Sequence, residues 1–295
     1  MNGKEQGFLL LTSTLGDPER KPLTVAQFRT LAQRARTMER PLLDRDLQAE
    51  DLMALGYDRP AAERIITLLS QTEQLNWYVA KGRKMDCYPI TRVGESYPAA
   101  LRSRLKMDAP GCLWAKGDVS ILKEPAIALV GSRDLNEENL AFAREAGRQA
   151  ALQGITLISG NARGADREAQ QAALEQGGKV ISIVADQLQK QPLRRNALYL
   201  SMEGFDLPFS SQRALSRNRV IHSLGSLTLI AQCGDGQGGT WSGTADNLRH
   251  GFSPVFCFDD GSPITEELTG MGAAAITLDD LSNLLTLCEK QEKLF

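Results

Sequence analysis

The chain has 295 residues, a formal net charge of −2, and 42% hydrophobic and 24% charged residues, which is ordinary for a globular protein. This balance excludes any overall electrostatic signal for nucleic acid, so local charge must carry such an interpretation. No run approaches the roughly 20 apolar residues of a membrane-spanning helix, and the N-terminus lacks a basic-then-apolar signal pattern. We therefore expect a cytoplasmic protein with no membrane contact.

Cysteine and histidine usage gives no indication of a metal site or a cofactor. The five cysteines are widely spaced and form no C-x-x-C motif, which predicts buried, reduced thiols. The two histidines leave little material for a zinc site or a Ser-His triad. The cysteines are Cys87, Cys112, Cys233, Cys257 and Cys288.

Residues 1–84 are predicted to form a small all-helical domain, similar to SAM or helix-hairpin-helix domains. Helical spacing of apolar residues covers Leu23 to Met38 and Leu47 to Leu55, and one long helix is expected from Pro60 to Tyr78. The turn from Leu55 to Pro60 resembles helix-hairpin-helix turns, whose amides hold nucleic-acid phosphates. The alternative is a plain packing or dimerisation role for this domain.

From residue 85 to 295 the pattern changes to alternating strands and helices. Such alternation predicts an α/β domain with an extended, Rossmann-like, doubly wound and mainly parallel sheet. A first apolar strand begins at Tyr88, and a helix is expected from Asp279 to the end. The remaining strands are predicted at Ile127–Val130, Thr156–Ile158, Val180–Val184, Leu227–Ala231, Val255–Phe258 and Ala274–Leu278.

Glycines and arginines follow several of these strands. The segment Leu157–Asp166 has the pattern of a strand, a tight turn and a helix, which is typical of a phosphate site. The bland alternative is a simple turn with Arg163 paired to a carboxylate. Ligands of such sheets bind at the carboxyl ends of the strands. The candidate phosphate-binding residues there are Gly131, Ser132, Arg133, Ser159, Gly160, Arg163, Gly164, Gly238, Gly239 and Thr240.

Charge is unevenly distributed over the second half of the chain. Residues 190–219 hold six basic and two acidic side chains, whereas residues 259–295 hold eight acidic and two basic ones. The basic stretch could follow a phosphate backbone, and the alternative is a solvated basic face.

Four motifs together resemble the DNA-processing protein A family (DprA, also called Smf), over roughly residues 40 to 258. They are Tyr97-Pro98 with the later Trp114 to Asp118, Gly131-Ser132-Arg133, Ser159 to Asp166, and Arg217-Asn218-Arg219. The resemblance implies a Rossmann-like domain behind a small helical one, homodimerisation, and binding of single-stranded DNA that is handed to a RecA-type recombinase. It adds Arg217, Asn218 and Arg219 to the DNA-contacting candidates.

The chain departs from the family pattern in several places. The family's glutamate-bearing strand is not evident around Met202 to Pro208, and a longer glycine-rich loop, Gly234–Gly243, precedes Thr244. The Gly-Arg that usually closes the next helix is Gly251-Phe252 here. We expect no C-terminal winged helix of the kind common in the family, because an acidic helix is expected there. These departures suggest a relative that works with a different protein partner.

Three functional interpretations follow. The first is a non-enzymatic binder of single-stranded DNA, in which Trp241 or Phe209 stacks on bases and the amides of Ser132, Gly160 and Gly164 assist the arginines. The second is a nucleotide-sensing or scaffold module, for instance in a bacterial defence or toxin-control pair. The third is a nucleotide phosphoribohydrolase-like enzyme, for which Asp246 is the only available acid after the glycine-rich segment.

Several other residues are expected to have structural roles. His222 is interpreted as a structural histidine, and His250 as a cation near a helix end. Asp166 is expected to cap its helix and to orient Arg163. Asp186 follows a strand and could contact a ribose.

Overall fold

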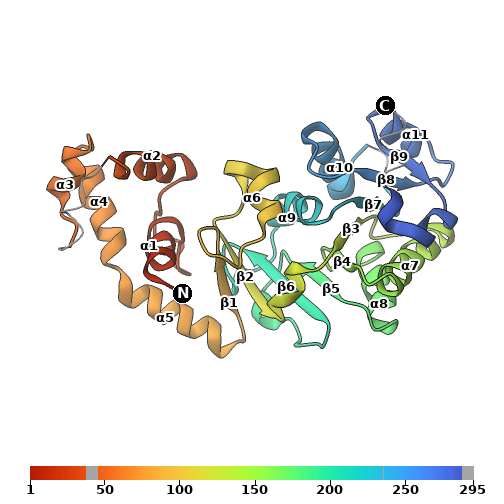
Figure 1. Cartoon of the computed structure of the whole chain (residues 1–295), viewed down its shortest axis with the longest axis horizontal. Helices are drawn as coiled ribbons and strands as arrows, with labels where there is room; N and C mark the ends of the chain where they lie inside the picture. Colours follow the sequence, from red (N-terminus) through yellow and green to blue (C-terminus); the bar gives the residue numbers. More distant parts are fainter. Residues whose placement is uncertain (38–45, 235, 288–295) are drawn as a thin grey trace.

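The computed structural model describes residues 1–37, 46–234 and 236–287 (Figure 1). Its centre is one sheet in the order β1-β2-β6-β5-β4-β3-β7-β8-β9, in which β1, β2 and β6 pair antiparallel and all other neighbours pair parallel. The strands are β1 Tyr88–Thr91, β2 Cys112–Gly117, β3 Ala126–Val130, β4 Thr156–Ser159, β5 Val180–Ile183, β6 Ala197–Met202, β7 Thr228–Ile230, β8 Val255–Phe258 and β9 Ala274–Ile276.

The predicted fold class is confirmed, and every predicted strand is present within two residues of its expected ends. Strands β2 and β6 were not predicted. Both are buried almost along their whole length, because β2 pairs with β1 on one side and β6 on the other. Strand β6 precedes the Arg-Asn-Arg motif but contains no glutamate, since it ends at Met202 and Glu203 follows it directly.

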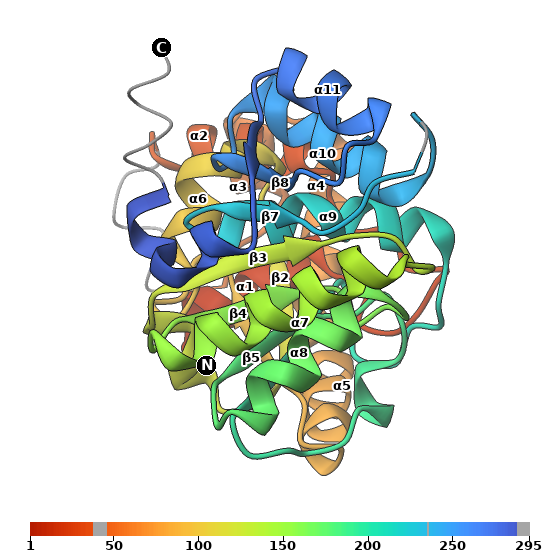
Figure 2. The same ribbon diagram turned by 90° about the vertical axis from the view of Figure 1, so that its right-hand side faces the viewer.

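Helices cover both faces of the sheet. Helices α7 (Glu137–Leu152) and α8 (Ala165–Glu175) lie side by side over β3, β4 and β5 (Figure 2). The opposite face carries α6, α9, α10 and α11. Their bounds are Ala99–Leu105, Ser211–Leu224, Gly238–His250 and Pro263–Gly270, and short 3₁₀ turns lie at Lys106–Asp108, Val119–Lys123 and Leu188–Lys190.

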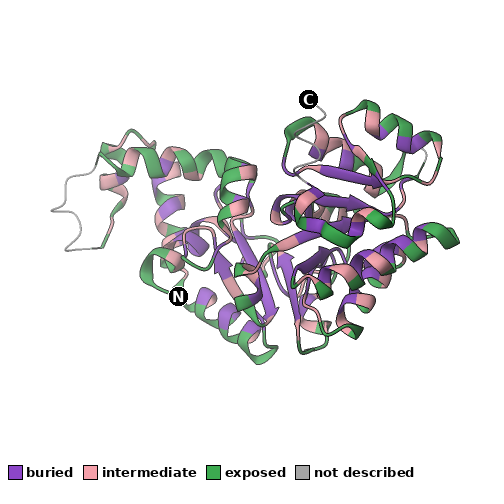
Figure 3. Ribbon diagram, turned by 45° about the vertical axis from the view of Figure 1, so that its right-hand side comes forward, coloured by how far each residue is buried: buried purple, intermediate pink, exposed green. Residues whose placement is uncertain are grey.

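Two apolar clusters form the core, one on each face, and the strands are the most deeply buried elements (Figure 3). One cluster holds Phe142 and the small residues of α7 and α8, and the other holds Leu101, Val220 and Ile221. Because both faces are covered, the parallel strands read as continuous apolar runs. That is why the sequence located them well.

The N-terminal region is helical, as expected, and gathers at the β1 edge of the sheet (Figure 1). The long helix predicted from Pro60 to Tyr78 is in fact two helices, because Gln71 has φ −78° and ψ 42° and interrupts the helical backbone. Met38 lies outside the described residues. The helices are α1 Gly3–Thr12, α2 Val25–Ala35, α3 Ala49–Ala54, α4 Arg59–Ser70 and α5 Thr72–Lys84.

Aromatic packing joins this helical region to the sheet. Tyr78 of α5 packs edge-on against Trp114 of β2, with ring centroids 5.2 Å apart, and Phe205 contacts both rings. A separate apolar cluster joins α2, α3 and α4 around Leu31, Leu52 and Ile65. The boundary at residue 84 stays a prediction, and α1 and α5 share a core with the sheet.

The end of the described chain is a 3₁₀ segment, Asp279–Thr286, rather than the start of an α-helix. The rest of the predicted acidic helix and Cys288 lie outside the described residues. The other four cysteines are buried free thiols, as predicted. Within residues 1–37, 46–234 and 236–287, no helix combines the length and the apolar character needed to cross a bilayer.

Candidate nucleic-acid interface

The carboxyl ends of β3, β4 and β5 open onto a hollow of about 400 Å³, which we call the arginine hollow. Three of the predicted arginines, Arg133, Arg163 and Arg217, line it together. The fourth arginine there, Arg167, was not singled out from the sequence and lies in the first turn of α8. The other residues that line the arginine hollow include Gly160, Asn161, Ala162, Val184, Ala185, Asp186, Gln191, Phe209 and Ala214.

A second hollow of about 680 Å³, the glycine hollow, lies where the sheet order reverses between β3 and β7. Gly131, Ser132 and Arg133 line it from β3, and Gly238, Gly239 and Thr240 line it from α10. The two hollows share the side chains of Arg133, Phe209 and Arg217. A crevice at this switch point is where doubly wound sheets hold their ligands.

A third hollow of about 500 Å³, the outer hollow, lies between α9 and α10 and includes Arg219, Trp241 and Arg249. It shares Leu215, Asn218 and Ser242 with the glycine hollow. The three hollows are therefore neighbours along α9.

The β4–α8 turn is stabilised from within by Asp166. One carboxylate oxygen, Oδ2, accepts hydrogen bonds from the amides of Gly160 at 3.0 Å and Ala162 at 3.2 Å. The sequence predicted that the Gly160 amide points at a bound phosphate. This prediction was wrong, because the amide already donates to a carboxylate of the protein. Asp166 also lies within α8, whose N-cap is Gly164, so it secures the turn before the helix rather than capping the helix.

Arg217 is the guanidinium that Asp166 faces. Its Nη1 lies 3.9 Å from Asp166 Oδ2, and the two side chains are only 11% and 7% exposed. Burial lowers the pKa of Arg217, although Asp166 opposes that shift, and burial raises the pKa of Asp166, although Arg217 opposes it. Arg217 Nε is buried without a hydrogen-bond partner among the described residues. The expectation that Asp166 orients Arg163 was wrong, since it faces Arg217.

Two of the predicted glycines allow close contacts within the protein. A Cβ at Gly160 would lie 1.2 Å from Arg217 Nη1, so the bare backbone makes room for that guanidinium. Gly164 has φ +88°, and a Cβ there would lie 2.4 Å from the Ser132 carbonyl oxygen. These two glycines therefore allow close packing within the protein around the site.

Arg163 and Arg133 are the exposed cations of the arginine hollow. Arg163 donates to Asp134 at 2.7 Å, but the two side chains are 69% and 82% exposed, so solvent screens this ion pair. Arg133 is exposed and forms no ion pair with any residue in the described ranges. Both guanidinium groups can therefore exchange water or a weak partner for an anion.

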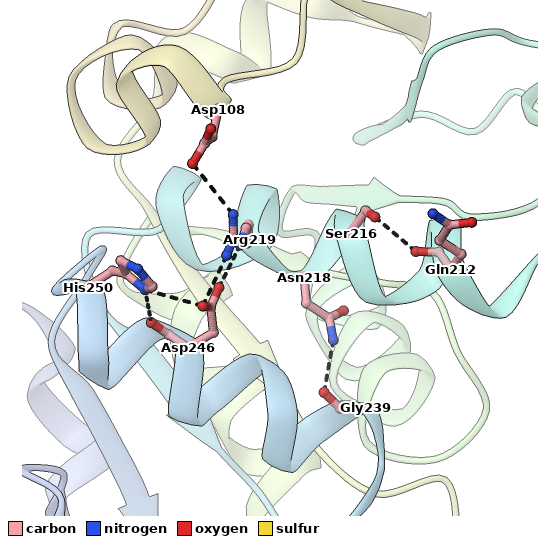
Figure 4. A network of polar contacts seen from close by, with 8 residues as sticks. All are labelled: Asp108, Gln212, Ser216, Asn218, Arg219, Gly239, Asp246 and His250. Carbon is pink, nitrogen blue, oxygen red and sulfur yellow. Dashed lines mark hydrogen bonds and ion pairs between the residues drawn. The ribbon is translucent and has the colours of Figure 1, made fainter.

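Arg219 faces away from Arg217. Positions two apart on a helix differ by about 200°, and Arg219 accordingly points toward α10, where Asp246 accepts from its Nε at 2.6 Å and from its Nη2 at 3.1 Å. Asp108 and His250 complete this network (Figure 4). These pairings raise the pKa of Arg219. The sequence placed Arg217 and Arg219 together, whereas the structure places them in different hollows.

The glycine-rich segment is shorter as a loop than predicted, because α10 begins at Gly238. Thr240 Oγ1 donates to the Gly131 carbonyl at 2.9 Å, and Asn218 Nδ2 donates to the Gly239 carbonyl at 2.9 Å (Figure 4). Both side chains thus connect the walls of the glycine hollow. The side chain of the N-cap residue, Gln237, makes no capping hydrogen bond to the first turn of α10.

Two predicted contact residues are not free to bind a phosphate as expected. Ser159 is fully buried at the end of β4. The Ser132 amide donates to the Gln232 carbonyl at 2.9 Å. Sequence position alone placed both at a strand end but could not show that the sheet and the neighbouring loop already cover these groups.

The structure gives different environments to the other residues that the sequence analysis interpreted one by one. His222 is buried and its Nδ1 lies 3.1 Å from Thr228 Oγ1, which confirms the structural role, and burial lowers its pKa to about 4. Trp241 packs partly against the core, whereas Phe209 is 54% exposed and lines both the arginine and the glycine hollow. Asp186 is exposed at the arginine hollow.

The fold and this strand edge define a Rossmann-like protein whose neighbouring surface hollows are lined by arginines. The family model for DNA recombination-mediator protein A matches residues 89–277. The chain therefore belongs to the DNA recombination-mediator protein A family, the DprA/Smf family.

Individual relatives match over shorter stretches. The DNA processing protein DprA of Streptococcus pneumoniae is 36% identical over 99 residues, which cover 34% of this chain and 31% of that protein. Protein Smf of Escherichia coli is 30% identical over 149 residues, covering 47% of this chain and 39% of Smf. The chain thus matches between about three and four tenths of the length of these relatives.

Solved structures confirm the fold. The X-ray structure of DprA from Streptococcus pneumoniae has a TM-score of 0.62 and 24% identity, and the match covers 88% of this chain and 97% of that one. DprA from Helicobacter pylori, whose structure is described in terms of its single-stranded DNA binding mode, has a TM-score of 0.56 and 22% identity, covering 69% and 96%.

Proposed function

We propose that this protein binds single-stranded DNA without regard to sequence and does not process it chemically. One observation carries the proposal: Arg133, Arg163 and Arg167 lie exposed around a hollow that Arg217 and Phe209 also line. Cations that follow a backbone together with an aromatic platform are the two components of sequence-tolerant single-strand binding.

The charge balance of the arginine hollow supports an anionic ligand. Its lining includes four arginines and one carboxylate, Asp186. Among the described residues that line the glycine hollow, the one carboxylate is Asp166, which already accepts two amide hydrogen bonds and faces Arg217. Neither hollow therefore presents an uncommitted row of carboxylates that would repel phosphates.

The position of the three hollows next to one another along α9 supports a polymer as the ligand. A strand that contacts Arg163 and Arg167 could pass over Phe209 into the glycine hollow and on toward Arg219 and Arg249. The relatives named for DNA processing, and the Helicobacter pylori protein described as binding single-stranded DNA, agree with this ligand class.

Hydrolysis of a nucleotide is less well supported. Asp246, the acid that this interpretation requires, accepts from Arg219 and lines the outer hollow rather than the glycine hollow. A carboxylate held in this bidentate pair does not face the glycine-rich turn. Release of free base from nucleoside monophosphates would contradict the non-enzymatic proposal directly.

A free nucleotide is the second candidate ligand, because the volume of the glycine hollow, about 680 Å³, is that of a small-molecule site. Under this alternative the protein is a sensor or scaffold. Mononucleotides would then bind as tightly as an oligonucleotide, and the affinity for oligonucleotides would not rise with their length.

The number of phosphate contacts can be tested by salt dependence. We expect the Arg163→Met variant to bind single-stranded DNA more weakly and to lower the slope of log affinity against log salt concentration by about 0.7, the value for one lost phosphate on a single strand. Fluorescence anisotropy over a salt series measures both quantities. Arg148→Met is the matched control, because Arg148 lies on α7, pairs with Glu145 and lines none of the three hollows. Equal slopes for both variants and the unmodified protein would remove Arg163 from the interface.

We further propose that the protein acts as a homodimer and hands the bound strand to a RecA-type recombinase or to a different protein partner. Family membership supports this role, since the matching model is that of a recombination mediator. Strand-exchange assays with and without the protein test the handover, and analytical ultracentrifugation tests the dimer. Normal DNA binding without any stimulation of a recombinase would favour the different partner.

A further inference from the structure

The segment from Glu203 to Ser210, which we call the strap, connects β6 to α9 and carries Phe209 at its end. Phe209 belongs to none of the three core clusters, so its position depends on the strap backbone rather than on packing of its ring. Contacts at both ends of the strap hold this backbone in place.

Arg213 holds the strap from α9. Its Nη1 donates to the carbonyl oxygens of Pro208 at 2.7 Å, Leu207 at 3.1 Å and Ala185 at 3.0 Å. Its Nη2 donates to Ser201 Oγ at 3.0 Å. Among the described residues no carboxylate forms an ion pair with Arg213. Its guanidinium group instead donates hydrogen bonds to carbonyl oxygens beside Phe209. The sequence grouped Arg213 with the cations that follow phosphates, and the structure turns it inward.

The other end of the strap is anchored to the N-terminal helices. Asp206 accepts from Tyr78 Oη at 2.9 Å and from Lys81 Nζ at 2.7 Å, and its side chain is only 16% exposed. Phe205 is fully buried between the rings of Tyr78 and Trp114. Helix α5 thereby fixes one end of the strap and Arg213 fixes the other.

We propose that Arg213 is a positioning residue for a base-stacking subsite at Phe209, and that the Asp206–Tyr78 contact makes helix α5 part of the same support. This inference rests on the proposed function and deepens it, since it separates recognition of bases from recognition of phosphates. The ligand of the subsite is a nucleobase ring, which is tolerated in any sequence because every base has an aromatic face.

The test compares two oligonucleotides of equal length, oligothymidine and its abasic analogue, which have the same phosphates. We expect Phe209→Leu to weaken binding of oligothymidine by about 5- to 150-fold, the range for losing one stacked base, and to leave the abasic strand nearly unaffected. Arg213→Met should reproduce this selective loss at an unchanged salt slope, and Arg213→Lys should restore part of it. Arg163→Met, as the control, should weaken binding of both strands by the same factor.

A double-mutant cycle distinguishes positioning from general structural damage. If Arg213 acts through Phe209, then Arg213→Met has little further effect in the Phe209→Leu background. Tyr78→Phe removes only one hydroxyl at the other end of the strap and should produce a smaller loss that is also selective for oligothymidine. This variant decides the question if Arg213→Met does not fold.

Three results would overturn the inference. Equal weakening of both strands by Arg213→Met, additive effects in the cycle, or no effect of Phe209→Leu would show that Phe209 only packs beside α9 as an N-terminal apolar contact. Absence of salt-dependent binding of either strand by the unmodified protein would instead contradict the proposed function itself.

Discussion

The Arg217→Met variant is expected to lower the free energy of unfolding by about 3–5 kcal/mol, because it leaves the buried carboxylate of Asp166 without its cation. Both side chains are almost fully buried, and the Asp166 carboxylate also holds the amides of Gly160 and Ala162. Loss of the guanidinium therefore weakens the turn that carries Arg163. Urea denaturation at neutral pH, followed by circular dichroism, measures the change.

Two further variants separate this effect from a loss of surface charge. Arg163→Met removes a guanidinium from an exposed pair, so the free energy of unfolding should change by less than about 1 kcal/mol. The double variant Arg217→Met, Asp166→Asn removes both charges and should recover part of the stability lost in Arg217→Met alone. If the effects of Arg217→Met and Asp166→Asn on the free energy of unfolding are additive in the double variant, the buried pair is not the source of the effect.

The stability of the Arg217→Met variant should depend on pH in a defined direction. Burial already raises the pKa of Asp166 in the folded protein, and removal of Arg217 raises it further because the nearby positive charge is lost. A carboxyl group with a raised folded pKa binds more protons when folded than when unfolded, so stability increases as pH falls through that pKa. Arg217→Met should therefore lose less stability than the unmodified protein on mild acidification.

A second large effect is expected from His222. Its pKa falls from 6.5 to about 4 in the folded protein, because the ring is buried. The unfolded chain then binds more protons between these values, so stability is complete above pH 6.5 and decreases as pH falls toward 4. The decrease attributable to this one ring is about 3 kcal/mol, at about 1.4 kcal/mol for each unit of pKa.

Denaturation curves measured across this pH range test the assignment to His222. The variant His222→Gln should lose this part of the pH dependence and should also be less stable at neutral pH, because Thr228 and Asn247 contact the ring. His250→Gln is the matched control, since His250 is the other histidine of the sequence and is exposed at the end of α10. An unchanged pH slope in His222→Gln would contradict the assignment.

The arrangement of Arg133, Arg163 and Arg217 around one hollow could be anticipated from the sequence. For Arg133 and Arg163 this follows from local patterns: apolar runs located β3 and β4, and the glycines after them marked the turns. Parallel strands place their carboxyl ends at the same edge of a sheet, so residues that follow different strands meet there. Arg217 lies on α9 and was expected at the site only from the resemblance to the DprA/Smf family.

Strands β2 and β6 and the break at Gln71 could not be read in the same way. The residues of β6 alternate little and are buried on both sides by pairing with β2 and β5. The pairing of β6 with β2 is made by segments more than 80 residues apart, as with Leu113 and Met202. Short apolar runs do not by themselves distinguish a strand from a turn of helix.

The sequence by itself determined the positions of seven of the nine strands in the described ranges, the turns that follow them and the presence of Arg133 and Arg163 at strand ends, because these depend on neighbouring residues along the chain. Only the tertiary structure decided what each charged group faces. Arg217 faces Asp166, Arg213 faces the strap carbonyls and Arg219 faces Asp246, although all three lie on one helix. Successive residues of a helix point in different directions, and the partner in each direction comes from a distant part of the chain. Exposure of Phe209 and Arg163, on which the proposed DNA binding depends, is decided in the same way.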